Sequence, residues 1–193
     1  MDLIWRREQR QQLLAQRMAM PPDERRSHNA TITALLLQSF PIRPGTVVGL
    51  YWPFKGEFDP RFAIRAWRAA GARTALPVVV QKNAPLKFRE WWPGVPTRKG
   101  VYDLPVPIDT PALQPEVLLI PPIGFDAQCY RLGYGGGYFD RTLAAMHPAP
   151  LRIGVAFELS RIATIHPQPH DIPMDVIVTE AGLQSPGKFI QKS

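Results

Sequence analysis

The segment Arg131–Arg141, RLGYGGGYFDR, combines residue types that suit a phosphate site. Its glycines can adopt positive φ and let backbone N–H groups approach a ligand closely. Arg131 can grip phosphate oxygens in two places, and Asp140 offers the hard carboxylate oxygen that Mg²⁺ prefers beside nucleotide phosphates. We therefore predict that this loop holds the phosphates of a nucleotide.

The loop differs from the common nucleotide-binding motifs. No Gly-Lys-Ser/Thr follows the glycines, so it is not a P-loop, and the glycine spacing departs from the dinucleotide fingerprint. A helix predicted over 137–146 would direct its unpaired N–H groups and the positive end of its dipole at the ligand. The competing interpretation is a flexible glycine-rich turn without a ligand.

Other polar residues can complete such a site. Glu57 follows an apolar run at 46–52, and α/β proteins tend to bind ligands at the carboxyl ends of their strands. Asp171 offers a second magnesium ligand, and Arg6 and Arg10, spaced i, i+4, share one helix face from which they can reach phosphate. Ordinary roles compete: a solvated loop acid for Glu57, a turn cap for Asp171 and a solvated helix face for the arginines.

Aromatic residues and the lone cysteine narrow the chemistry further. Trp52 and Tyr102 can stack on a flat ring, although most large aromatic side chains belong to the core. No Gly-x-Ser-x-Gly elbow occurs, and Cys129 has no helix start beside it that would lower its thiol pKa. The sequence therefore argues against acyl-enzyme chemistry.

The elements that must position these residues alternate between helices and strands. Helices are predicted over 2–19, from Asp23 to near Pro41, and over 59–70 and 137–146; strands are predicted over 46–52, 74–80, 117–120, 153–157 and 176–179, with shorter extended pieces at 86–92 and 101–104. This alternation predicts an α/β domain with a largely parallel sheet. We expect one domain over 1–193, comprising a helical segment at 1–40 and an α/β core at 45–183.

Composition limits the environment and the partners. The chain has 193 residues, 45% of them hydrophobic, and no apolar run long enough to cross a membrane. Its N-terminus lacks the apolar stretch of a signal peptide, so we expect a cytoplasmic protein. The net charge of +7 suits an anionic small molecule. Because the basic residues are scattered and form no stripe or reading motif, nucleic acid is not the predicted partner.

Several ordered motifs together resemble the 5-formyltetrahydrofolate cyclo-ligase family, also called 5,10-methenyltetrahydrofolate synthetases. The resemblance covers nearly the whole chain. The motifs that carry it are LYWPFKGE at 50–57, ALPVV at 75–79, FREW at 88–91, IPPIGFD at 120–126, YRLGYGGGYFDR at 130–141 and HDIPMDVIVTE at 170–180. The segment at 130–141 is the most specific of them.

The resemblance implies a three-layer, Rossmann-like α/β fold and a reaction. In that reaction ATP and Mg²⁺ convert 5-formyltetrahydrofolate to 5,10-methenyltetrahydrofolate with release of ADP and phosphate. The formyl oxygen is phosphorylated, N10 attacks the activated carbon and phosphate leaves. Such a step needs alignment and charge neutralisation rather than a protein nucleophile.

The resemblance also implies roles for individual residues. ATP contacts are expected from Arg6, Arg10, Arg131, Leu132, Gly133, Tyr134, Gly135, Gly136, Gly137, Tyr138 and Phe139. Folate contacts are expected from Trp52, Glu57, Tyr102, Tyr134, Gly135, Gly136, Gly137 and Tyr138. Asp140 and Asp171 fall at magnesium positions, and Arg131, Tyr138 and Asp140 are the expected catalytic residues.

The sequence departs from the family pattern at three places. Arg6 stands where lysine is usual, Phe139 replaces a frequent tyrosine, and a glutamine common near Ser160 is missing. These departures leave open weakened activity or a relative acting on another N-formyl compound. A non-catalytic nucleotide- or RNA-binding member is a separate alternative, against which the intact acids Glu57, Asp140 and Asp171 argue. A monomer is favoured, and the positive charge suits a polyglutamylated folate, although no residue is assigned to the polyglutamate tail.

Overall fold

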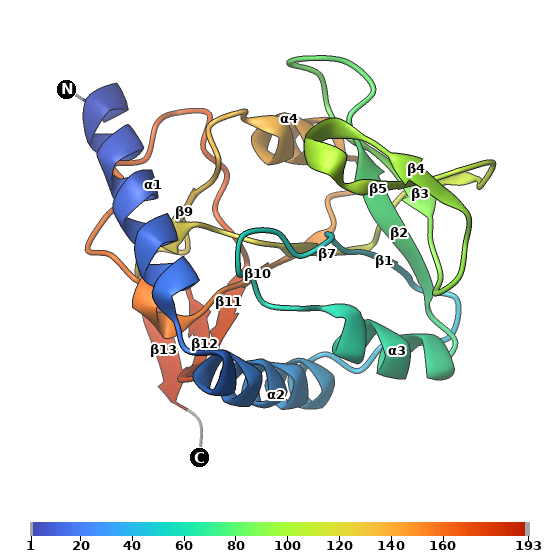
Figure 1. Cartoon of the computed structure of the whole chain (residues 1–193), viewed down its shortest axis with the longest axis horizontal. Coiled ribbons are helices and arrows are strands. Elements are labelled where there is room, and N and C mark those ends of the chain that lie inside the picture. The colour runs from blue at the N-terminus through green and yellow to red at the C-terminus, as the bar shows by residue number, and fades with distance from the viewer. Residues whose placement is uncertain (1, 192–193) are drawn as a thin grey trace.

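The computed structural model describes residues 2–191 and is built around a nine-stranded sheet of order β13-β12-β11-β10-β7-β1-β2-β3-β6 (Figure 1). The five central strands pair in parallel. They are β1 (Val47–Gly49), β2 (Arg73–Val78), β7 (Val117–Ile120), β10 (Leu151–Val155) and β11 (Val176–Thr179). Their β-branched and aliphatic residues are buried almost throughout, as expected for strands covered on both faces.

Antiparallel strands extend both edges of this parallel centre. One edge carries β3 (Lys87–Glu90) and β6 (Ala112–Leu113), and the other carries β12 (Gly182–Ser185) and β13 (Lys188–Gln191). Two small hairpins lie outside the sheet: β4 (Thr97–Lys99) with β5 (Pro105–Pro107), and β8 (Gly124–Phe125) with β9 (Arg131–Leu132).

Helices cover the two faces of the sheet and make three layers. α2 (Pro22–Ser39) and α3 (Arg61–Ala69) lie on one face, and α4 (Tyr138–Ala145) lies on the other (Figure 1). Leu119 of β7 belongs to the core cluster shared with α2 and α3, whereas Leu118 belongs to the cluster shared with α4. This alternation follows the two-residue period of a strand. The predicted α/β fold with its parallel centre is confirmed.

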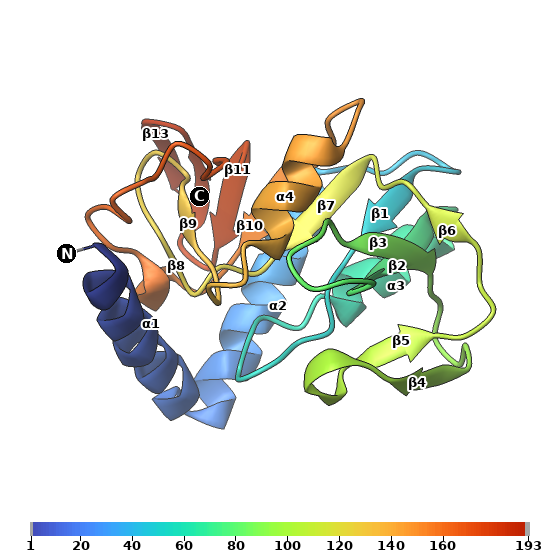
Figure 2. The same cartoon turned by 90° about the horizontal axis from the view of Figure 1, so that it is seen from above.

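The first helix, α1 (Asp2–Ala19), lies beside the β8–β9 hairpin at one side of the molecule (Figure 2). Leu13 of α1 packs there with Ile123 and Leu132 in a small apolar cluster. The opposite surface of the helix is open, and Leu3 is 83% exposed. In the described part of the chain, every helix is too short or too polar to span a bilayer.

The boundaries differ from the sequence predictions where strands are short. The run 46–52 forms only the three-residue β1, and the expected extended piece at 101–104 is instead a 3-10 turn, Val101–Asp103. The two hairpins outside the sheet and the C-terminal β12–β13 hairpin were not predicted. The sheet therefore continues past the expected end of the core at residue 183.

The order of strands places a topological switch point between β1 and β7. The chain winds from β1 to β2 on one side and returns to β7 on the other, so the connections leave these neighbours in opposite directions. The carboxyl ends of strands at such a switch point are where α/β folds bind ligands. Close packing between these strands requires Gly49, because a Cβ there would lie 2.4 Å from Cδ2 of Leu118.

We predict that Leu119→Ala lowers the free energy of unfolding by about 2–5 kcal/mol, because it leaves a cavity between the sheet and its helices. The matched change Leu3→Ala, on the exposed side of α1, should alter it by less than about 0.5 kcal/mol. Urea unfolding followed by circular dichroism measures both. Equal effects would contradict the burial described for Leu119.

Candidate active site

A cavity of about 560 Å³ opens at the carboxyl ends of β1, β2 and β7, next to the switch point. It brings together nearly all the residues expected from the sequence: Arg6, Arg10, Trp52, Glu57, Tyr102, Arg131, Gly133, Tyr134, Gly135, Gly136, Gly137, Tyr138, Phe139, Asp140 and Asp171. Leu132 is the exception, because its fully buried side chain packs against Leu13 in the apolar cluster under α1. Any contact of Leu132 with a ligand in the cavity must therefore come from its backbone.

The glycine loop curves along one wall of the cavity and leads into α4. Gly135 and Gly137 have φ of 97° and 64°, in the left-handed region that favours glycine. Gly137 is the N-cap of α4, so the first N–H groups of this helix lie where the loop meets the cavity. Arg141 Nη1 donates to the carbonyl of Gly136 at 2.6 Å and holds the loop from the helix. The predicted loop-to-helix transition is confirmed.

Two arginines of α1 reach this loop and the segment after it. Arg10 Nε donates to the carbonyl of Gly133 at 2.7 Å. Arg6 Nη2 lies 2.5 Å from Oδ2 of Asp171 and donates to the His166 carbonyl at 2.8 Å. Burial and the neighbouring positive charge of Arg6 lower the pKa of Arg10. An anionic ligand beside this pair would offset that repulsion.

A third arginine and the second carboxylate form a compact unit behind the loop. Arg131 Nη2 lies 2.9 Å from Asp140 Oδ1, and its Nη1 donates to the Ile172 carbonyl at 2.8 Å. The Ile172 N–H donates back to the same Asp140 oxygen at 3.1 Å. Burial lowers the pKa of Arg131, and the Asp140 charge opposes that change. The guanidinium is thus fixed in place at the edge of the cavity.

The residues fit Mg²⁺ only in partnership with a ligand. Within residues 2–191 no group of three or more acid, histidine or cysteine side chains gathers as a metal cage. Asp140 and Asp171 both line the cavity, and Asp140 Oδ1 lies beside Arg131 Nη2 and accepts from the Ile172 N–H. Mg²⁺ commonly takes one or two carboxylates and completes its shell with phosphate oxygens and water. The donor set agrees with that arrangement.

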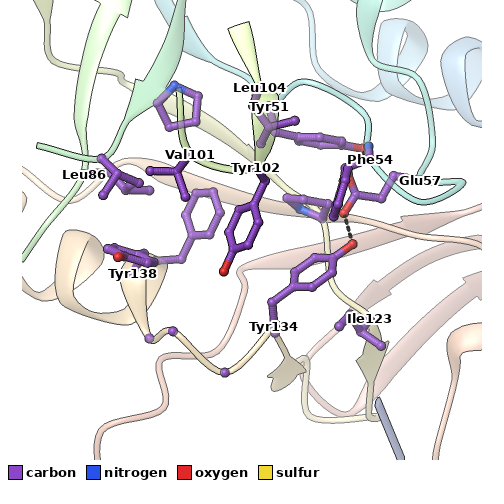
Figure 3. A pocket seen from close by; sticks show the side chains of 18 of the residues that line it. Tyr51, Phe54, Glu57, Leu86, Val101, Tyr102, Leu104, Ile123, Tyr134 and Tyr138 are labelled. Atoms are coloured by element: carbon purple, nitrogen blue, oxygen red, sulfur yellow. Dashed lines mark hydrogen bonds between the residues drawn. The ribbon is translucent and has the colours of Figure 1, made fainter. Parts of the chain in front are cut away.

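Glu57 lies at the other end of the cavity and is almost fully buried (Figure 3). Tyr134 points from the glycine loop toward it and donates its hydroxyl to Oε1 at 2.8 Å, and the Phe54 N–H donates to Oε2 at 2.9 Å. Burial raises the pKa of Glu57 to about 7, while Arg17 and the Tyr134 hydroxyl act in the opposite direction. The carboxylate is therefore costly to ionise and is held in a fixed orientation.

Aromatic rings line the space between these two ends. Phe54 stacks with Tyr102 at 6.2 Å between ring centroids and meets Tyr134 at 6.1 Å. Tyr102 has φ of 57° and is 74% exposed, and Figure 3 shows it projecting between Tyr134 and Tyr138. The gap among these rings suits a flat heterocycle. Phe54 was not among the predicted site residues.

Trp52 is partly a core residue and partly a lining residue. Its ring meets Trp91 edge-on at 6.0 Å, and the Arg61 guanidinium lies 4.9 Å from its centroid. It also contacts the cavity. Trp52 thus fits in part both interpretations that the sequence left open, a ring that can stack on a ligand and a core aromatic.

Arg17 is the polar residue behind the cavity that the sequence analysis missed. It is 3% exposed, and its Nη2 donates to the Tyr134 hydroxyl at 2.7 Å. A signal was present, because Arg17 follows Arg10 by seven residues and so shares the helix face of Arg6 and Arg10. Its burial depends on how α1 packs on the loops, which helical periodicity does not define.

Comparison with known proteins assigns this chain to a family. The model of the 5-formyltetrahydrofolate cyclo-ligase family matches residues 3–180, nearly the whole chain. The chain belongs to that family. The resemblance drawn from its motifs is confirmed, and membership places the chain among ligase enzymes.

Individual members of the family agree in sequence and fold. The 5-formyltetrahydrofolate cyclo-ligase of Escherichia coli (strain K12) is 28% identical over 170 residues, covering 84% of this chain and 93% of that protein. The 5,10-methenyltetrahydrofolate synthetase of Aquifex aeolicus superposes with a TM-score of 0.80 at 26% identity, over 97% of this chain and 96% of that one. The synthetase of Mycoplasma pneumoniae, at 24% identity and a TM-score of 0.74, shares the fold over 91% of this chain and 98% of its own.

The raised pKa of Glu57 predicts a pH-dependent stability. The ordinary value is 4.5 and the folded value is about 7, so the contribution of this group is fully present below about pH 4.5 and is lost as the pH rises through 7. We expect the wild-type protein to lose stability relative to Glu57→Gln over that window in urea unfolding. Glu90→Gln is the control, because Arg73 lowers the pKa of Glu90 and its difference should stay flat there. A flat difference for Glu57→Gln as well would contradict the assignment.

Proposed function

We propose that this chain converts 5-formyltetrahydrofolate to 5,10-methenyltetrahydrofolate with consumption of ATP in the presence of Mg²⁺. One observation carries the proposal: a single cavity joins a cationic glycine loop at one end to a buried carboxylate with aromatic neighbours at the other. A nucleoside triphosphate suits the glycine-loop end, and a pterin suits the end with the buried carboxylate. The family and the names of its members support the same substrate.

The chemistry requires that the two substrates meet. The oxygen of an N-formyl group is a poor leaving group until the γ-phosphate of ATP is transferred to it. That transfer forms a bond between the formyl oxygen and phosphorus and breaks the bond to ADP. N10 then attacks the activated carbon, loses its proton, and the C–O bond breaks as phosphate leaves. Alignment and neutralisation of phosphate charge are the main demands on the protein.

The residues at the loop end suit the phosphate-binding part of this reaction. Arg6 and Arg10 approach from α1, and Arg131 approaches from β9, so positive charge surrounds the glycine loop on two sides. The N–H groups at the start of α4 add donors that need no reorganisation. Tyr138, the first residue of α4, offers a hydroxyl beside the same loop.

Asp140 and Asp171 are the residues that would hold Mg²⁺. Bound there together with ATP, the ion would neutralise phosphate charge and align the γ-phosphate for transfer. The carboxylates themselves also orient the arginines, since each is paired with one of them. Each carboxylate lies on the cavity wall, where it could exchange its contact with an arginine for a contact with the metal.

The buried end suits the pterin ring. An ionised Glu57 would accept hydrogen bonds from the N–H groups of the ring, and the Tyr134 hydroxyl fixes the carboxylate for that contact. Phe54, Tyr102 and Trp52 supply flat apolar surface next to it. The formyl group at N5 would then lie between Glu57 and the phosphate end.

A direct assay tests the proposal. Purified protein with 5-formyltetrahydrofolate, ATP and Mg²⁺ should produce the absorbance of the methenyl product, and omission of ATP should abolish it. Absence of product from folded protein would contradict the proposed function. An ATP-consuming reaction with a different N-formyl compound in place of the folate would redirect it to another substrate.

Asp140→Asn should lower kcat by about 100-fold or more, because it removes the carboxylate charge expected to serve the metal and Arg131. Asp175→Asn is the matched control, since Asp175 also pairs with an arginine, Arg152, but neither residue lines the cavity. This control should keep its kcat within about twofold. Equal activity of Asp140→Asn and the wild type would remove Asp140 from the metal role.

A further inference from the structure

Arg17 is a buried cation that lies behind the folate end of the cavity. Its Nε donates to the Lys55 carbonyl at 3.0 Å and its Nη1 donates to the Pro122 carbonyl at 3.3 Å. These carbonyls follow β1 and β7, so the guanidinium spans the strand ends at the switch point. Neutral carbonyls satisfy its N–H groups, but they do not balance its charge.

Glu57 lies within ion-pair distance of this cation. Arg17 Nη2 is 3.8 Å from Glu57 Oε1, too far for a direct hydrogen bond, and the Tyr134 hydroxyl links them. Arg17 donates to that hydroxyl at 2.7 Å, and the hydroxyl donates to Glu57 at 2.8 Å. The direction of the first bond is fixed, because a guanidinium can only donate, and the Tyr134 hydroxyl keeps its own proton to donate to Glu57. The chain of contacts favours a carboxylate that accepts.

The other charged or titratable groups near Glu57 make their own contacts elsewhere. Tyr51 is buried nearby, and its hydroxyl donates to the Phe58 carbonyl at 2.9 Å. Arg25 of α2 lies against the backbone of Gly56 and donates to carbonyls of the Arg17–Met20 turn. The Lys55 ammonium lies over the Phe54 ring at 5.1 Å. Arg17, followed by the Tyr134 hydroxyl and the Phe54 backbone N–H, opposes the effect of burial on the pKa of Glu57.

We propose that Arg17 is a positioning residue that keeps Glu57 ionised and oriented toward the folate, acting through the Tyr134 hydroxyl. The inference rests on the proposed folate-binding role of Glu57. It explains how a carboxylate that is buried away from water can accept hydrogen bonds from the pterin near neutral pH. It also assigns two tasks to the same loop, since Tyr134 sits between Gly133 and Gly135 of the phosphate site.

The test is the pH dependence of KM for 5-formyltetrahydrofolate at saturating ATP and Mg²⁺. KM should rise when the pH falls below the value at which Glu57 takes up a proton. Removing the charge with Arg17→Met should shift that midpoint to a higher pH, by about one unit or more. The KM for ATP should remain near the wild-type value, and Arg17→Lys, which keeps the charge, should restore part of the profile. A profile for Arg17→Met that keeps the wild-type midpoint, even with uniformly higher KM, would overturn the proposal.

Two further variants separate charge from structure. Tyr134→Phe removes the linking hydroxyl and leaves the backbone contacts of Arg17, so the midpoint of its KM–pH profile should also move to a higher pH. This variant replaces Arg17→Met as the test if Arg17→Met does not fold. Arg25→Met removes an arginine that holds the same helix turn without reaching Tyr134, and its midpoint should match the wild type. An upward shift in Arg25→Met equal to that in Arg17→Met would assign the effect to loosened helix packing and overturn the proposal.

Direct titration of Glu57 by carbon-13 NMR in the ligand-free protein makes the two proposals distinguishable. A higher Glu57 pKa in Arg17→Met supports the role of Arg17 whether or not the protein turns over folate. An unchanged pKa overturns that role even if the wild-type enzyme is fully active. Absence of turnover in the wild type contradicts the proposed function alone.

Discussion

The buried positive charge on one face of α1 is the constraint on which the site depends. Arg6 and Arg17 are nearly inaccessible to solvent, and a buried guanidinium is stable only where acceptors and negative charge surround it. Their acceptors come from three separate places: the segments after β1 and β7, Tyr134 of the glycine loop, and the segment around Asp171. The helix therefore holds together loops that are distant in the sequence.

This arrangement gives the cavity two ends of different character. At the phosphate end the arginines outnumber the acids that contact them, which suits a polyanion. At the other end the Glu57 carboxylate is buried beside aromatic rings and is connected through Tyr134 to a different arginine, Arg17. The reaction that we propose needs both environments within one enclosed space, since the phosphate acceptor belongs to the second substrate.

The sequence predicted the features that depend on local pattern. The amphipathic pattern of α3 and the apolar run of β7 defined their elements, and the glycine loop indicated a backbone that only glycine adopts easily. The family motifs then indicated which loops lie together. The residues brought to the cavity agree with that expectation, although their roles there stay predictions.

What the sequence did not predict depends on packing between elements. Strands of two or three residues, such as β6 and β9, have no measurable periodicity and exist because a neighbour pairs with them. The left-handed turn at Tyr102 follows from a hairpin that was itself unexpected. Arg17 resembles any solvated helix arginine until α1 is placed against the loops.

We propose that the formyl oxygen of the folate attacks the γ-phosphate of ATP inside this cavity. The measurement that tests it most directly is a reaction with 5-formyltetrahydrofolate labelled with oxygen-18 in the formyl group, followed by mass analysis of the released phosphate. We expect the label to appear in inorganic phosphate. Release of the label as water, with unlabelled phosphate, would contradict it.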